Sequence, residues 1–271
     1  MAANTAAEPR GYPERVHITG AARSGTTLML ALMLTCFEID GGVARETRLW
    51  RAPVRGRRVV LTKQPDDEKL ALFLSRFDPK LHIVYMLRDP REVIVSRHGT
   101  DPNRYWTNLR AWRESLAVAQ PSFGHPRLHV VRYEALIRDP DGVQRTLSQS
   151  MPFLKPVRPF SRFHEVAELQ NSQWRAAMGS IRSLGVKEPS WRSHLPRLKG
   201  QLLRHGDISD ELIQFGYEQD KNWLALLDNI DPLSHESRTP ERESLRRSFD
   251  HGWRDILGVI AYAGQRIAFG P

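Results

Sequence analysis

The stretch from Ile18 to Leu28, with the sequence ITGAARSGTTL, narrows the folds that are open to this chain. A β-branched run ends there and an apolar run begins, so a tight turn is expected between a strand at residues 15–19 and a helix at Thr26–Phe37. Gly20 and Gly25 would allow backbone conformations that leave amide N–H groups unpaired. These groups and the positive end of the helix dipole would converge on one point, which suits a phosphate dianion.

The same stretch departs from the Walker pattern at one position. The spacing from Gly20 to Gly25 matches that pattern, but Thr26 stands where a lysine would follow the second glycine. Because that lysine reaches the β- and γ-phosphates of a nucleoside triphosphate, its absence argues against ATP or GTP hydrolysis. Arg23 is the cation of the loop and would lie along a phosphate or sulfate group. A turn without a ligand is the alternative if the loop is taken alone.

Composition restricts the partners and the chemistry of the chain. Its 271 residues include 40 Lys+Arg against 31 Asp+Glu, a formal net charge of +9. This surplus favours anionic partners, such as nucleotides, sulfated substrates, nucleic acid or an anionic membrane face, without selecting among them. Cys36 is the only cysteine, which excludes an internal disulfide and a cysteine-based zinc site. The longest apolar run, Leu28–Phe37, is too short to span a bilayer, so a cytoplasmic protein is expected.

Strands and helices are expected to alternate along the first 150 residues of the chain. The clearest strand is His82–Leu87, which is nearly continuous in apolar residues, as a buried parallel strand should be. The alternation predicts an α/β fold with a central parallel β-sheet flanked by helices. Ligands bind beyond the carboxyl ends of such strands, where the loop, Lys63, Arg88 and Arg132 would gather. Further strands are expected at residues 57–62 and 128–133, and further helices at 66–77, 92–98, 106–120 and 142–150.

A second motif follows the strand His82–Leu87. It begins with Arg88-Asp89-Pro90-Arg91 and continues into an expected helix that carries Ser96, eight residues after the first arginine. Arg88 would offer paired, planar donors to a phosphate group at the end of the strand, and Ser96 would add a hydroxyl group. Taken alone, the motif also fits a helix that starts at Asp89-Pro90, with Arg88 paired to a carboxylate.

Together, the loop and this motif resemble the sulfotransferases that use 3′-phosphoadenosine 5′-phosphosulfate (PAPS). The segment Arg132-Tyr133-Glu134-Ala135-Leu136, with Asp139-Pro140, is similar to a sequence that follows a strand in the same family. The resemblance implies a P-loop NTPase-like three-layer sandwich that binds PAPS, or its product adenosine 3′,5′-bisphosphate, without a metal. The residues implied to bind the 5′-phosphosulfate are Ala22, Arg23, Ser24, Gly25, Thr26 and Thr27; Arg88 and Ser96 would bind the 3′-phosphate, and a late loop with Arg182, Ser183, Gly185, Trp191 and Arg192 would close over the nucleotide.

The implied reaction moves a sulfuryl group from PAPS to a hydroxyl or amine group of an acceptor. The basic composition weakly favours an anionic or carbohydrate acceptor, such as a glycolipid. Arg23 would stabilise charge on the departing phosphate, at a position where many members of the family carry a lysine. Lys63 would contact the sulfate or the leaving phosphate; a lysine that merely ends a strand is its alternative.

A general base is needed to take the proton of the acceptor. Members of the family use a glutamate after the first helix or a histidine after the second strand, and here Gln64 occupies the place of that histidine. Glu46 is therefore the first candidate, with Glu38 and Asp40 behind it. The alternative for Glu46 is an exposed glutamate paired with a neighbouring arginine, Arg45 or Arg48.

The chain is expected to divide into three parts. Residues 1–14 would form a flexible lead, residues 15–230 the sulfotransferase domain, and residues 231–271 a polar linker and a C-terminal amphipathic helix. The terminal segment, residues 256–269, would dock on the core, on a second subunit or on a membrane surface. A monomer, a homodimer and peripheral membrane contact therefore all stay open, and no nucleic-acid partner is expected.

Two other classes of function stand as alternatives. A P-loop nucleotide or small-molecule kinase would need an ATP-binding lysine and a magnesium carboxylate that the sequence does not place. A basic, non-enzymatic module for nucleic acid or anionic glycans would fit the net charge, but no motif that reads RNA or DNA is visible.

Overall fold

The computed structural model describes residues 11–98, 101–166, 184–186, 188–242 and 245–268. Within these ranges, the centre is a five-stranded sheet in the order β2-β3-β1-β4-β7, and each neighbouring pair of strands runs parallel. The strands are β1 (Glu14–Thr19), β2 (Gly41–Gly42), β3 (Val59–Lys63), β4 (Leu81–Leu87) and β7 (Leu128–Arg132).

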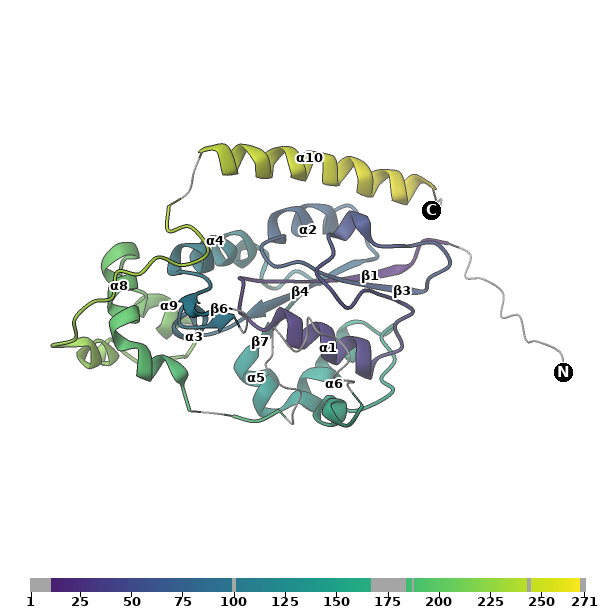
Figure 1. Ribbon diagram of the computed structural model, residues 1–271. Helices are drawn as coiled ribbons and strands as arrows, with labels where there is room; N and C mark the ends of the chain where they lie inside the picture. Colours follow the sequence, from purple (N-terminus) through teal and green to yellow (C-terminus); the bar gives the residue numbers. More distant parts are fainter. Residues whose placement is uncertain (1–10, 99–100, 167–183, 187, 243–244, 269–271) are drawn as a thin grey trace.

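Helices cover both faces of this sheet (Figure 1). One face packs against α1 (Thr26–Cys36), α5 (Tyr133–Arg138) and α6 (Pro140–Ser150). The other face packs against α2 (Glu68–Ser75) and α4 (Leu109–Ala119). This arrangement confirms the predicted α/β fold, a three-layer sandwich around a central parallel sheet.

The pattern of apolar residues in β4 explains why both faces must be covered. Ile83 and Leu87 pack into the cluster with α2 and α4, whereas Val84 and Met86 pack into the cluster with α1. Successive side chains of a strand point to opposite faces, so a continuous apolar run needs a helix on each side. Each fully buried aliphatic side chain contributes about 1.5–3 kcal/mol relative to exposure.

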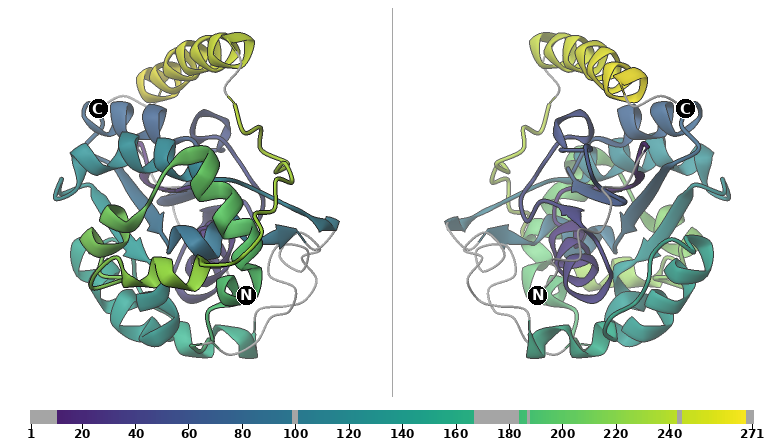
Figure 2. Two further views of the ribbon diagram at one scale, coloured as in Figure 1. Left: turned by 90° about the vertical axis from the view of Figure 1, so that its left-hand side faces the viewer. Right: turned by 90° about the vertical axis from the view of Figure 1, so that its right-hand side faces the viewer.

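A third apolar cluster is formed by elements that lie beyond the carboxyl end of the sheet. The ribbons of these elements face the viewer in Figure 2, left. The cluster joins α3 (Pro90–Ile94) and the hairpin β5 (Arg97–His98) and β6 (Asp101–Tyr105) to three later elements. These are a 3₁₀ helix (Ser190–His194), α8 (Leu195–His205) and α9 (Ser209–Gln214). The later part of the chain thus closes over the end of the sheet where ligands are expected.

Several predicted elements have different bounds in the structure; α4, for example, begins at Leu109 and not at residue 106. The helix predicted at residues 92–98 is instead the short α3, because the chain leaves it at Val95 and enters the β5–β6 hairpin; Ser96 therefore follows the helix. The strand predicted at residues 57–62 begins later, at Val59. The carboxylate of Asp40 accepts hydrogen bonds from the backbone N–H groups of Arg58 and Val59, which fixes the approach to β3.

The C-terminal helix α10 (Leu245–Ala268) begins before the predicted residue 256 and lies outside α2 (Figure 1). It docks on α2 and on a 3₁₀ helix at Leu49–Arg51. Tyr262 is buried, and its hydroxyl group donates to Asp78 Oδ2 at 2.6 Å. Among the helices of the described residues, none has the length and apolar character that crossing a membrane requires.

Candidate active site

A cleft of about 1030 Å³ lies where β1, β3, β4 and β7 end. It brings together side chains from the loop, from the second motif and from the late part of the chain. Of the residues predicted from the sequence to bind the nucleotide or to act in catalysis, those that line it are Ala22, Arg23, Gly25, Thr26, Thr27, Glu46, Lys63, Arg88, Ser96, Gly185, Trp191 and Arg192. Arg182 and Ser183 lie outside the described residues.

The loop owes its shape to two glycines in the left-handed region. Gly20 has a φ of +136°, and a Cβ atom there would lie 2.5 Å from the carbonyl oxygen of Met86. Gly25 has a φ of +101°, and its Cβ would lie 2.6 Å from the ring of Tyr133. Gly25 also precedes α1, whose first turn has neither a side-chain cap nor an acidic residue. The N–H groups of that turn can therefore donate to an anion in the cleft.

Ser24 differs from the other predicted loop residues because its side chain turns away from the cleft. It is 1% exposed, and its buried hydroxyl oxygen has no hydrogen-bond partner among the described residues. Its backbone N–H donates to Ala21 O at 3.0 Å, so the residue closes the turn from behind. Ser24 thus supports the loop, and in this conformation its hydroxyl does not face the cleft.

Arg23 connects the loop with the second motif. Its Nε donates to Ser96 Oγ at 2.8 Å, and a terminal nitrogen donates to Arg97 O at 3.0 Å. The guanidinium of Arg88 in turn donates to the backbone oxygen of Arg23 at 3.0 Å. The two predicted phosphate-binding regions therefore form one continuous wall of the cleft.

Glu92 and Tyr133 hold the side chain of Arg88 in place, and its Nε–H group remains available to a ligand. It pairs with Glu92 Oε2 at 3.2 Å, and its Cζ lies 4.2 Å from the ring centroid of Tyr133. Its buried Nε has no hydrogen-bond partner among the described residues. A buried guanidinium N–H without a partner is costly, so an anion that accepts from it would be stabilised there.

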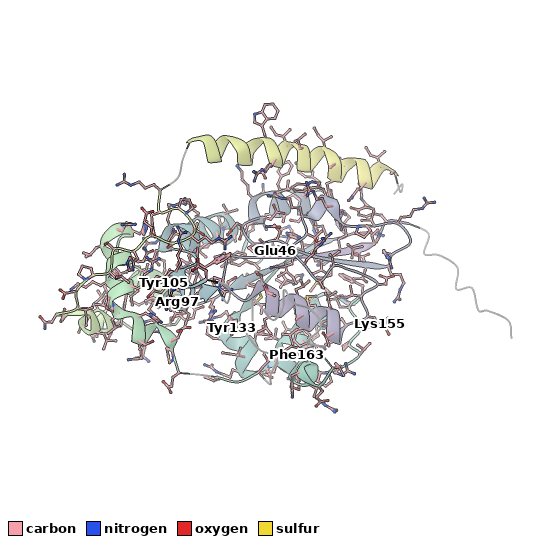
Figure 3. The ribbon with its side chains drawn as sticks, viewed as in Figure 1. Glu46, Arg97, Tyr105, Tyr133, Lys155 and Phe163 are labelled. Carbon is pink, nitrogen blue, oxygen red and sulfur yellow. The ribbon has the colours of Figure 1, made fainter. Side chains whose placement is uncertain are left out.

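Lys63 and Glu46 form an ion pair in the lining of the cleft. Lys63 is buried at the end of β3, and its Nζ lies 2.9 Å from Glu46 Oε1 and 3.1 Å from Thr27 Oγ1. The carboxylate of Glu46 is 57% exposed. In Figure 3, Glu46 and Tyr133 lie toward the carboxyl ends of the strands.

Arg23, Lys63 and Arg88 lie close together at this end of the cleft. Burial and mutual repulsion shift the pKa values of Arg23 and Lys63. Burial, followed by repulsion from Arg88, lowers the pKa of Arg23 below its usual range. Burial lowers the pKa of Lys63, the ion pair with Glu46 opposes the shift, and repulsion from Arg23 adds to it. Cations held together at a cost in free energy indicate a site that an anion would complete.

The reserve candidates for the general base lie outside this cleft. Asp40 is engaged with the backbone before β3, and Glu38 lies 3.6 Å from Arg58 on the exposed surface. The amide of Gln64, which stands in place of a histidine, donates to the backbone oxygen of Pro65 at 3.4 Å. Glu46 is thus the remaining one of the three carboxylates predicted as bases, and it pairs with Lys63 instead of Arg45 or Arg48.

The late loop is fastened to the second motif by two charged side chains. Glu92 accepts hydrogen bonds from Ser190 Oγ at 2.7 Å and from the backbone N–H of Trp191 at 3.0 Å. Arg91 is buried, pairs with Asp89 at 2.8 Å, and stacks its Cζ 4.3 Å from the ring centroid of Trp191. Trp191 is therefore fixed beside the residues that follow β4.

Several side chains of the cleft wall were not predicted individually. Tyr133 packs on Arg88 and limits the space at Gly25, and Glu92 holds both Arg88 and the late loop. Tyr217 donates to Glu134 Oε2 at 3.2 Å, and the other oxygen of that carboxylate accepts from Asp89 N. Arg132 was predicted to lie with Lys63 and Arg88 beyond the ends of the strands, and it lines the cleft. Tyr133 and Glu134 entered the sequence analysis only as part of a likeness, because no local pattern reveals what their side chains contact.

A strand, a glycine-bounded loop and a helix N-terminus that face the cations Arg23, Lys63 and Arg88 define a P-loop-like protein with an anion-binding cleft. Residues 43–151 match the model of a family described as Sulfotransferase family. The match covers a part of the chain and agrees with the predicted resemblance to sulfotransferases. The matched segment contains Glu46, Lys63, Arg88 and Ser96, while the loop at residues 20–27 lies before it.

Among solved structures, the sulfotransferase domain of the Synechococcus PCC 7002 olefin synthase is 17% identical, with 69% of this chain and 90% of that chain covered and a TM-score of 0.40. A sulfotransferase domain from the curacin biosynthetic pathway is 14% identical, with 65% and 85% covered and a TM-score of 0.39. Retinol dehydratase in complex with androsterone and the inactive cofactor PAP is 16% identical, with 83% and 84% covered and a TM-score of 0.39. These likenesses are distant. Among curated proteins, none matches this chain.

Proposed function

We propose that the cleft binds PAPS by both of its phosphorylated ends and transfers its sulfuryl group to a hydroxyl or amine group. The observation that carries this proposal is the cluster of Arg23, Lys63 and Arg88 around the N-terminus of α1. The amides of the loop suit the 5′-phosphosulfate. Arg88 and Ser96, on the adjoining wall, suit the 3′-phosphate.

In this proposal, Arg23 and Lys63 stabilise charge, and Glu46 transfers a proton. The bond between sulfur and the bridging oxygen breaks while a bond from sulfur to the acceptor oxygen or nitrogen forms, and the leaving group is adenosine 3′,5′-bisphosphate. Arg23 and Lys63 stabilise the negative charge that develops on the bridging oxygen and the departing phosphate. Glu46, whose carboxylate accepts a hydrogen bond from Lys63, takes the proton of the acceptor.

Arginine at position 23 restricts the mechanism. A guanidinium stays protonated at any physiological pH, so Arg23 stabilises charge without giving a proton to the leaving phosphate. Lys63 can do both, because burial lowers its pKa. The acceptor class is proposed from the basic composition as a carbohydrate or glycolipid. A cytoplasmic location is also proposed, since Cys36 is the only cysteine and no internal disulfide can form.

Transfer of label from radioactive PAPS to a panel of carbohydrate, phenol and amine acceptors tests this function. We expect labelled product and an equal amount of released adenosine 3′,5′-bisphosphate. Arg23→Ala should abolish both signals, whereas Arg145→Ala, which changes an exposed arginine on α6, should leave them unchanged. Phosphoryl transfer from ATP with magnesium, in place of sulfuryl transfer, would replace the proposal with the kinase alternative.

A further inference from the structure

The segment that carries Glu46 has little regular structure of its own. Residues 43–48, all of them described, form neither a helix nor a strand, and a single 3₁₀ turn follows at Leu49–Arg51. The carboxylate of Glu46 is 57% exposed and pairs with Lys63. Because buried backbone carbonyl groups need donors, the partners of this segment must come from other parts of the fold. The position of the proposed base therefore depends on tertiary contacts.

The donors to this segment come from α10 and from β1. Gln265 Nε2 donates to Trp50 O at 2.8 Å and to Ala52 O at 3.3 Å. The guanidinium of the buried Arg15 donates to Leu49 O and, at 3.2 Å, to Oε1 of Gln265. Three backbone carbonyl groups of the segment are thus satisfied by two side chains that contact each other.

Close packing makes a second connection between α10 and the segment. A Cβ atom built at Gly258 would lie 2.8 Å from the ring of Trp50. Gly258, Tyr262 and Gln265 follow the spacing i, i+4, i+7, so they lie on one face of the helix. Tyr262 fixes this inner face on the core through a hydrogen bond of 2.6 Å from its hydroxyl group to Asp78 Oδ2.

The restraint reaches Glu46 through the residues that follow it. The N–H of Thr47 donates to Lys63 O at 2.8 Å. The guanidinium of Arg48 lies over the ring of Trp50, with its Cζ 5.2 Å from the ring centroid. Glu46 is therefore held between β3 on one side and a series of contacts that leads to α10 on the other.

From these contacts we propose that the inner face of α10 is a positioning element of the active site, which holds residues 46–52 in place and thereby the carboxylate of Glu46. Gln265 and Gly258 supply the restraint. The proposal rests on the proposed role of Glu46 as the general base. Misplacement of a catalytic group by about 1 Å can slow a reaction about 100-fold, so a helix can set the rate without touching the substrate. None of the described residues of α10 lines the cleft.

A purely structural role for α10 is the alternative, and the two roles differ in what they affect. The nucleotide is proposed to be held by Arg23 and Arg88, whose hydrogen bonds are made with the loop, with α3 and with the residues after α3. Loss of positioning should therefore slow sulfuryl transfer and leave nucleotide affinity unchanged. General destabilisation of the fold would lower both.

Hydrogen exchange of the full chain, followed by mass spectrometry, tests the restraint without a ligand. Gly258→Ala and Gly264→Ala are a matched pair on α10, because an added Cβ atom has close neighbours at the first position and nothing within 4 Å at the second. We expect the peptide that contains the N–H of Thr47 to exchange about tenfold faster in Gly258→Ala and at an unchanged rate in Gly264→Ala. Equal exchange in the two variants would overturn the proposal.

Transfer of label from radioactive PAPS, to whichever acceptor of the panel above gives the most product, tests the consequence for catalysis. Gln265→Leu should lower kcat about tenfold, while the Kd for adenosine 3′,5′-bisphosphate stays within about twofold. In the Glu46→Gln background, Gln265→Leu should have no further effect, because a positioning residue acts through the group that it positions. Thermal unfolding establishes that each variant is folded.

Three results of this experiment would overturn the proposal: full activity of Gln265→Leu, a weaker Kd that accounts for its loss of activity, or an equal loss of activity in the Glu46→Gln background. No transfer by the unchanged chain would overturn the proposed function and this proposal with it. Failure confined to the Gln265 variants would overturn this proposal alone.

Discussion

Arg23 and Ser96, 73 residues apart in the chain, meet through a hydrogen bond of 2.8 Å between Nε and Oγ. The bond joins the loop before α1 to the segment after α3. It also restrains the side chain of Arg23 between the proposed sites for the two phosphorylated ends of the nucleotide. The loop and the second motif therefore act as one site.

Ser96→Ala should weaken the binding of adenosine 3′,5′-bisphosphate by about fivefold. The substitution removes a proposed donor to the 3′-phosphate and the partner of Arg23, a loss of about 1 kcal/mol. Competition against a fluorescent nucleotide measures the effect. Ser193→Ala, which removes an exposed hydroxyl of the late loop, is the matched control. An unchanged affinity would count against a role for Ser96.

Gly25→Ala should destabilise the fold and abolish nucleotide binding. The new methyl group would lie 2.6 Å from the ring of Tyr133, at a φ of +101° that alanine rarely adopts. We expect a loss of about 1–3 kcal/mol in the free energy of unfolding by urea. Gly252→Ala lies within α10 with open space around its Cβ and should be neutral or stabilising. Equal stabilities of the two variants would contradict the loop geometry.

Glu46→Gln should reduce the rate of sulfuryl transfer about 100-fold or more while nucleotide affinity stays the same, because the amide cannot take the acceptor's proton. Steady-state rates and calorimetric titration separate these two effects. Glu38→Gln changes a carboxylate of the same segment that lies outside the cleft and should retain full activity. Full activity in Glu46→Gln would require a different base.

The pair His82 and His129 should make the fold less stable in acid. Their nitrogens are 3.0 Å apart, and burial, with repulsion from His82, lowers the pKa of His129 to about 4. The unfolded chain binds protons below about pH 6.5, where folded His129 stays neutral, so the free energy of unfolding falls between about pH 6.5 and about pH 4.

Urea unfolding at about pH 7.5 and about pH 5 measures this effect. His129→Gln should reduce the difference in stability between the two pH values. His235→Gln, an exposed histidine, should leave the difference as it is in the unchanged chain. The same pH dependence in all three proteins would show that the histidine pair does not contribute.

Local patterns sufficed to predict much of the fold. The run of apolar residues in β4 and the glycines before α1 specify their own conformations, so the sheet, the loop and the position of Arg88 could be anticipated. The β5–β6 hairpin could not be predicted from local sequence, because it is short and polar and depends on distant contacts. Tyr105, for example, is held by a hydrogen bond of 3.0 Å between its hydroxyl and His194 Nδ1.

In the candidate site, too, the features set by local sequence were predicted and those set by distant contacts were not. Arg23, Lys63 and Arg88 were predicted to lie together because parallel strands end at one edge of the sheet. The side chains that orient these cations were not predicted, since Tyr133 and Glu92 reach Arg88 only through the packing of β7 and the turn of α3. Amphipathy likewise predicted the helix α10, while its contacts with the core include a hydrogen bond between Gln265 and the buried Arg15 that no local pattern reveals.

Calorimetric titration of two ligands against two proteins tests the central claim most directly. The ligands are adenosine 3′,5′-bisphosphate and adenosine 5′-monophosphate, and the proteins are the unchanged chain and Arg88→Ala. Because Arg88 is proposed to hold the 3′-phosphate, the substitution should weaken binding of the bisphosphate about 10- to 100-fold and leave the monophosphate nearly unaffected. Equal losses for both ligands, or no loss for either, would contradict the claim that the cleft holds the nucleotide by both ends.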